Sequence, residues 1–123
     1  MFVNDFYTYR LIRQTDDVIE ATITINPKHR IFDGHFPEYP LVPGVVQIQI
    51  IKEVASQCLN CQLQLVQSKN IKFLAMISPL QVQELQLRIA YRLLDENHYK
   101  IEAQLYNDTR SFLKLKGTYR ATH

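Results

Sequence analysis

The chain has 123 residues, of which 46% are hydrophobic and 21% are charged, and its formal net charge is +2 at pH 7. This length suffices for one domain with a core that needs neither disulfides nor metal ions. The small net charge does not indicate a nucleic-acid-binding protein, and no segment approaches the roughly 18 apolar residues of a membrane span. Because residues 1–5 show no basic stretch leading into an apolar one, no export signal is predicted. We therefore expect a cytoplasmic protein with a single domain over residues 1–123.

The chain begins with a predicted β-hairpin. Residues 6–14 combine aromatic and aliphatic side chains, and residues 15–17 form the predicted turn. In the second strand, residues 19–25, Ile and Ala alternate with Glu and Thr, which is typical of a strand with one buried face. Asn26 and Pro27 end this strand.

Residues 27–44 are predicted to form a loop with a fixed path. Four of the five prolines and two of the three glycines lie in this stretch. Each proline restricts its own backbone and that of the residue before it, so the loop is not a flexible linker. Ile31 and Phe32 are expected to anchor it to the core.

A helix is predicted from Val45 to about Asn60. Pro43 suits a position in the first turn of a helix. The apolar residues at helical spacing are Val45, Ile48, Ile51, Val54, Ala55, Cys58 and Leu59, and Val46 and Ile50 widen this surface. A helix that is apolar on most sides should be covered by a sheet wrapped against it or by a partner chain.

The rest of the chain is predicted to form antiparallel strands. They cover residues 63–77, ending at Ser78 and Pro79, and then residues 84–93, 99–105 and 113–119, with turns at 95–97 and 107–109. The element order is two strands, a loop, one helix and then three or four strands. A curved antiparallel sheet wrapped around one central helix, an α+β fold, is the simplest arrangement.

Cys58 and Cys61 form a Cys-x-x-Cys pair at the end of the predicted helix. A second Cys or His pair at ligand spacing is absent from the sequence, so no metal site is predicted. Redox pairs of this kind usually open a helix, where its dipole acidifies the thiol. Two ordinary reduced cysteines are therefore expected.

The loop and the helix start carry a family signature. Residues 34–37 read Gly-His-Phe-Pro, and residues 40–45 read Pro-Leu-Val-Pro-Gly-Val. This combination resembles the 3-hydroxyacyl-[acyl-carrier-protein] dehydratases, the FabZ- and FabA-like hotdog proteins, in which a sheet wraps a central helix. The resemblance implies elimination of water from 3-hydroxyacyl thioesters in fatty-acid or related lipid or polyene synthesis. It also implies an acyl carrier protein that presents an acyl-phosphopantetheine substrate, no cofactor, and a site built across a homodimer or dimer-based oligomer.

The resemblance also implies roles for individual residues. His35 corresponds to the catalytic histidine, and Gly44 to the glycine whose backbone N–H polarises the thioester carbonyl. Gln49 lies where the family has a glutamate or aspartate, and Glu53 lies one turn further on, where the glutamate branch usually has a glutamine. The two residue types have therefore changed places. The substrate-binding loop would include Phe36, Pro37, Pro43 and Val45.

The chemistry of the reaction agrees with these positions. Imidazole has an unperturbed pKa of about 6.5, which suits removal of the proton next to a thioester. N–H groups at a helix start stabilise the negative charge that develops on the thioester oxygen. The leaving hydroxyl needs an acid or an ordered water, and a neutral Gln49 can hold either group but cannot give up a proton.

Several interpretations remain open at this point. Glu53 is either a substitute acid or a polar residue that pairs with Lys52 or with water at the helix surface. The protein is a dehydratase, a hotdog thioesterase, or a catalytically impaired acyl-binding or partner subunit. Basic residues flanking the pocket mouth would attract an acidic carrier protein, and the candidates are Lys28, Arg30, Lys69 and Lys72. No role is assigned to His29, His98 or His123.

Overall fold

The computed structural model describes residues 2–33 and 40–123, and Met1 and residues 34–39 lie outside the described residues. The elements along the chain are β1 (Tyr7–Gln14), β2 (Val18–Ile25), the 3₁₀ helix η1 (Arg30–Phe32), α1 (Gly44–Leu59), β3 (Gln62–Phe73), β4 (Glu84–Asp95), β5 (His98–Tyr106) and β6 (Ser111–Thr122). The strands and the helix correspond to the predicted elements in type and order.

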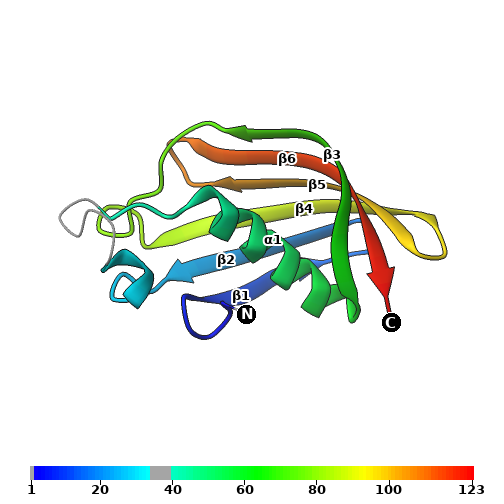
Figure 1. The fold of residues 1–123 in the computed structure, drawn as a ribbon, viewed down its shortest axis with the longest axis horizontal. Helices are drawn as coiled ribbons and strands as arrows, with labels where there is room; N and C mark the ends of the chain where they lie inside the picture. The colour runs from blue at the N-terminus through cyan, green and yellow to red at the C-terminus, as the bar shows by residue number, and fades with distance from the viewer. Residues whose placement is uncertain (1, 34–39) are drawn as a thin grey trace.

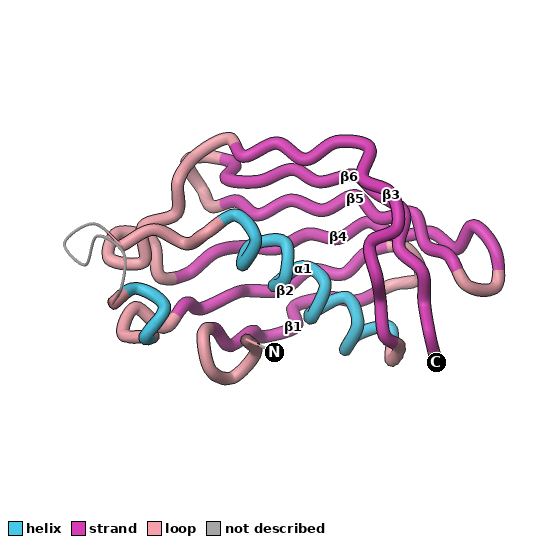
Figure 2. Tube along the Cα trace, in the orientation of Figure 1, coloured by secondary structure: helices cyan, strands magenta, loops and turns pink. Residues whose placement is uncertain are grey.

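The strands form one antiparallel sheet in the order β1-β2-β4-β5-β6-β3. Helix α1 lies across one face of this sheet, and β3 and β6 bend near the C-terminal end of the helix (Figures 1 and 2). Two register shifts in the pairing of β3 with β6, after Leu65 and after Ser68, accompany this bend. The predicted α+β hotdog arrangement, a curved sheet around one central helix, is confirmed.

The helix begins and ends close to the predicted residues. Pro43 is the residue before the first turn, and Asn60 closes the helix in the left-handed conformation with φ of 55°. Asparagine tolerates this conformation better than most residues, which explains why the helix stops here. This helix, the longest in the described chain, is neither long nor apolar enough to cross a membrane.

Helix α1 buries most of the predicted apolar surface in the core. Val46, Ile50 and Val54 are buried at spacings of four residues, whereas Val45 is 76% exposed. The sheet therefore covers one side of the apolar helix and leaves Val45 uncovered. An apolar run with few polar interruptions does not define which side of a helix faces the sheet.

The end of β3 also differs from the prediction. The strand stops at Phe73, so the predicted continuation to Ile77 is wrong. Leu74 donates its backbone N–H to the carbonyl of Phe112, and Ile77 accepts from the N–H of Val42 at 2.9 Å. The segment after β3 therefore leaves the ladder and binds the residues that lead into α1.

The described part of the loop before α1 is anchored as predicted. Phe32 is 5% exposed and Ile31 is partly buried against the core. Cys58 and Cys61 are free thiols, and burial raises the pKa of both. Within residues 2–33 and 40–123, no group of three or more His, Cys, Asp and Glu side chains could hold a metal ion.

Candidate active site

The structure describes only part of the predicted site. His35, Phe36 and Pro37 lie outside the described residues, so their relation to the helix is not described. The remaining predicted residues lie on α1 or directly before it, and they are Pro43, Gly44, Val45, Gln49 and Glu53.

Gly44 opens α1 under an aromatic ring. A Cβ atom placed on Gly44 would lie 2.8 Å from Cζ of Phe73, so a side chain here would require that ring to move. Gln47 is 3% exposed and donates from Nε2 to the carbonyl of Val42 at 3.2 Å. The first N–H groups of a helix have no partner within it, and they favour negative charge. This end of α1 therefore carries N–H groups without a partner inside the helix, which is the feature that the predicted role of Gly44 requires.

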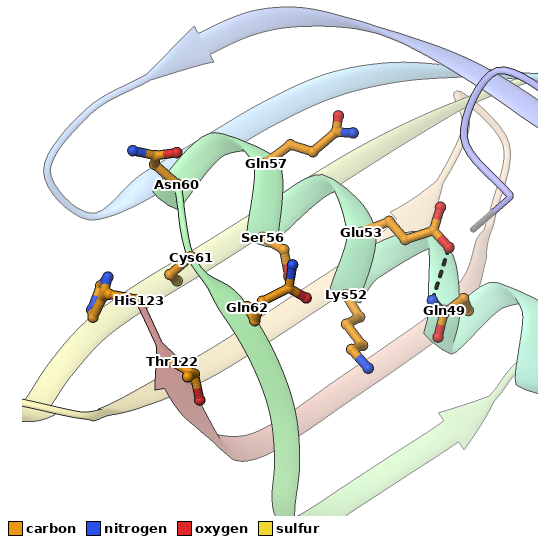
Figure 3. Close-up of a pocket in the computed structure, with 10 residues that line it drawn as sticks. All are labelled: Gln49, Lys52, Glu53, Ser56, Gln57, Asn60, Cys61, Gln62, Thr122 and His123. Carbon is orange, nitrogen blue, oxygen red and sulfur yellow. Dashed lines mark hydrogen bonds between the residues drawn. The ribbon is translucent and has the colours of Figure 1, made fainter.

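Gln49 and Glu53 are in direct contact. The Gln49 Nε2 atom donates a hydrogen bond of 2.8 Å to Oε2 of Glu53 (Figure 3). Residues four apart lie on the same face of a helix, so this contact follows from their spacing. The structure thus brings together the two residues for which the family resemblance implies an exchange of types.

Glu53 is a buried carboxylate that binds the N-terminal segment. Its side chain accepts from the backbone N–H of Phe2 at 3.0 Å, from the N–H of Val3 at 2.9 Å and from the Tyr7 hydroxyl at 3.0 Å. The residue is 3% exposed. The interpretation of Glu53 as a surface residue paired with Lys52 or water is therefore wrong, because chain segments far apart in sequence enclose it.

These contacts determine the charge state of Glu53. Burial by itself raises the pKa of this carboxyl, but the hydrogen bonds from Phe2, Gln49, Val3 and Tyr7 together lower it below its ordinary value. Burial and the neighbouring Glu53 raise the pKa of the Tyr7 hydroxyl. Glu53 is thus ionised and Tyr7 protonated at neutral pH, which favours an anchoring role for Glu53 over that of a proton donor.

A cavity of about 500 Å³ opens beside this pair. Its lining side chains come from α1 and from the adjoining ends of β3 and β6, and Figure 3 shows Gln49, Lys52, Glu53, Ser56, Gln57, Asn60, Cys61, Gln62, Thr122 and His123. Among the described residues, the buried Ser56 hydroxyl has no hydrogen-bond partner. A water molecule or a polar ligand group in the cavity would satisfy this hydroxyl.

The four predicted carrier-protein contacts are all exposed, but they do not surround this cavity. Lys69 lines a separate depression with Lys100 and Lys116, on the sheet face away from α1. Lys72 lies directly opposite Lys114 in the pairing of β3 with β6. The described structure therefore does not group these cations around one pocket mouth.

Some residues around the site were not predicted to contribute to it. Tyr7 reads as the start of an ordinary strand, and backbone donors such as the N–H of Phe2 leave no signal in a sequence. His29 had no assigned role, yet it is 6% exposed and joins two segments. Its Nδ1 accepts from the N–H of Ile31, so its Nε2 carries the hydrogen that bonds to Asp5 at 3.0 Å.

Comparisons with known proteins identify the family of this chain. The sequence model of the ApeI-like family, described as ApeI dehydratase, matches residues 11–111. The dehydratase FabZ of Streptococcus equi subsp. zooepidemicus is 35% identical over 46 residues, which are 37% of this chain and 33% of that protein. FabZ of Thermotoga neapolitana is 40% identical over 45 residues, again 37% of this chain and 33% of that protein. The matches thus span about a third of the length of these curated relatives.

Solved structures share the fold at low sequence identity. A chain of the dehydratase heterocomplex ApeI:P from Xenorhabdus doucetiae is 21% identical, with a TM-score of 0.68 over 90% of this chain and 96% of that one. A hypothetical thioesterase protein with coenzyme A from Streptococcus pneumoniae also has a TM-score of 0.68, at 12% identity over 94% of this chain and 86% of that one. The fold therefore does not separate dehydratases from thioesterases. The sequence match over residues 11–111 does, and the chain belongs to the ApeI-like dehydratase family.

Proposed function

We propose that the protein is a cytoplasmic dehydratase that removes water from 3-hydroxyacyl thioesters carried by an acyl carrier protein, in fatty-acid or related lipid or polyene synthesis. One observation carries the proposal. Within the region matched by the dehydratase family, Gly44 opens α1, and Gln49 on the same helix lines a cavity. This order provides N–H donors for a thioester oxygen and a hydrogen-bonding group for the substrate hydroxyl.

The proposed reaction assigns a separate task to each group. His35 removes the proton from C2, and the electron pair forms the C2–C3 double bond as the C3–O bond breaks. The N–H groups at the start of α1 stabilise the charge that develops on the thioester oxygen. The departing hydroxide takes up a proton and leaves as water. Because Gln49 cannot supply this proton, we propose that the His35 imidazolium returns it, directly or through a water molecule.

We also propose that the site is completed in a homodimer or a dimer-based oligomer. Large apolar side chains are exposed near the start of α1 and around the end of β3, with Val45 at 76%, Phe73 at 52% and Met76 at 75%. In addition, β3 is the last strand of the sheet order, so its outer edge has no neighbouring strand within the described chain. Light scattering should give at least twice the 14.5 kDa chain mass. A stable monomer at micromolar concentration would contradict the shared-site proposal.

A second candidate function is an acyl-binding or partner subunit without chemistry of its own. The observation that favours it is the hydrogen-bond saturation of Glu53, which leaves the described part of the site without an evident proton donor. Such a subunit would bind acyl carrier protein or a related chain but would not convert its substrate.

The experiment that tests the proposal is turnover of 3-hydroxyacyl-acyl-carrier-protein by the wild type, by His35→Ala and by His98→Ala. We expect His35→Ala to lower turnover by about 10²–10⁴-fold with little change in melting temperature, because positioned acid–base groups contribute on this scale. His98 is a matched control, since it pairs with Asp95 in the turn between β4 and β5. Equal loss in both variants would count against His35 as the base. Release of free thiol instead of enoyl product would show thioesterase activity in place of dehydration.

A further inference from the structure

On the basis of the dehydratase function proposed above, we propose that Glu53 is a positioning residue that fixes the polarity of the Gln49 amide. The bond between them turns the Gln49 NH₂ group toward Glu53 and its carbonyl oxygen Oε1 away from it, as Figure 3 shows. The site therefore offers substrate a hydrogen-bond acceptor. It selects acyl groups that carry a donor, the 3-hydroxyl, over those that carry only an acceptor, such as a 3-oxo group.

The orientation of the amide follows from the chemistry of its partner. An ionised carboxylate accepts hydrogen bonds and donates none, so only the NH₂ end of Gln49 can face it. The reversed amide would place two acceptor oxygens at the observed separation of 2.8 Å without a hydrogen between them. Leaving a buried acceptor in that state carries a substantial penalty.

The N-terminal segment holds Glu53 in place for this task. Its Oε1 accepts from Val3 and Tyr7 and shares the N–H of Phe2 with Oε2, whereas Oε2 is the atom that accepts from Gln49. The two oxygens thus bind different sets of donors. One side of the carboxylate attaches the start of the chain, and the other side orients the residue that faces the cavity.

Because the two carboxylate oxygens bind different donors, the Glu53→Gln variant tests the positioning role directly. In that variant the amide oxygen can keep the donors from Phe2, Val3 and Tyr7, so its NH₂ group takes the place of Oε2. Gln49 must then turn its own oxygen toward the new NH₂ group and present its NH₂ to the cavity. The variant should therefore reverse the polarity of the site while preserving most of the anchor.

The first measurement is binding of two non-hydrolysable probes, the pantetheine amides of 3-hydroxybutanoate and 3-oxobutanoate, by titration calorimetry. The wild type should prefer the hydroxy probe, and Glu53→Gln should shift the ratio of dissociation constants toward the oxo probe by about 10-fold or more, as expected for one reversed buried hydrogen bond. Gln49→Met, which has no amide, should lose the preference. Tyr7→Phe removes one donor to Glu53 but keeps its charge, so the ratio should stay unchanged.

The second measurement needs no ligand, so it tests the positioning role even if neither probe binds. In ¹⁵N–¹H NMR spectra, the Gln49 side-chain amide should show one proton protected from exchange with water in the wild type and in Tyr7→Phe. The resonance should change in Glu53→Gln. Retained protection with no binding of either probe would support the positioning role and count against the dehydratase function. An unprotected amide in the wild type, or an unchanged binding ratio in Glu53→Gln, would overturn the positioning role itself.

Discussion

Two carboxylates hold the N-terminal segment of this protein, and they do so in different surroundings. Glu53 is 3% exposed and binds the backbone of Phe2 and Val3 from within the fold. Asp5 has a side chain that is 49% exposed and accepts from the buried His29 at 3.0 Å. Both contacts join residues at the start of the chain to elements next to the candidate site.

The two contacts differ in what their partner groups can bind once the contact is lost. The hydrogen bond from His29 is the main cause that lowers the pKa of Asp5, and water can solvate the half-exposed Asp5 carboxylate once that bond is lost. The pKa of Glu53 is lowered although burial opposes it, and its donors have no other described acceptor within the fold. The attachment of the N-terminal segment, and with it the orientation of Gln49, therefore depends mainly on Glu53.

Removing each carboxylate should give the largest contrast. We expect Glu53→Ala to lower the free energy of unfolding by about 2–4 kcal/mol, because it leaves buried N–H and hydroxyl donors unpaired. Asp5→Ala should have a clearly smaller effect, since it leaves one buried donor unpaired, the Nε2–H of His29, instead of several. Urea denaturation followed by circular dichroism measures both. An equal loss of unfolding free energy in the two variants would contradict the larger contribution expected of the buried Glu53.

Adding a carboxyl beside Glu53 should have the next largest effect. In Gln49→Glu the new carboxyl lies next to an ionised one, which raises its pKa and keeps it protonated near neutral pH. We expect turnover to rise by about 10-fold or more, since the site gains a proton donor. In the double variant Gln49→Glu/Glu53→Gln the neighbour is neutral, so activity should fall off at a lower pH. Steady-state rates across pH separate the two cases, and identical profiles would contradict this coupling.

The acid dependence of stability should show a smaller effect. The folded-state pKa of Glu53 is lowered, so its contribution is present above the unfolded value of about 4.3 and is lost as pH falls through the folded value. Glu53→Gln should therefore flatten the decline in stability below about pH 4.3 relative to the wild type. Thermal melts between neutral and acidic pH test this, with Asp5→Asn as the exposed counterpart. A parallel decline in the wild type and Glu53→Gln would contradict the lowered pKa.

Much of the fold follows from local patterns in the sequence. Alternation predicts β2 and β4, and Pro43 and Asn60 mark the ends of α1 within a residue or two. The exposure of Val45 does not follow, because an almost continuous apolar run leaves the facing side of the helix undefined. The end of β3 at Phe73 is set by hydrogen bonds to residues distant in the chain. Tertiary contacts therefore determine both the side of α1 that is buried and the residue at which β3 ends.

Part of the candidate site also follows from local patterns in the sequence. The spacing of Gly44, Gln49 and Glu53 on one helix follows from the sequence, including the proximity of the last two. The burial of Glu53 does not, since it depends on backbone N–H groups of Phe2 and Val3, some 50 residues away in the chain. The role of His35 stays a prediction, because that residue lies outside the described residues.

The central claim is that this helix and its loop belong to a working dehydratase. Its most direct test runs the reaction backward, by incubating purified protein with a trans-2-enoyl-acyl-carrier-protein and following the acyl mass by mass spectrometry. We predict enzyme-dependent gain of one water, lost in His35→Ala and faster in Gln49→Glu. An unchanged acyl mass with both the wild type and Gln49→Glu, at protein concentrations where the chain is dimeric, would contradict the claim.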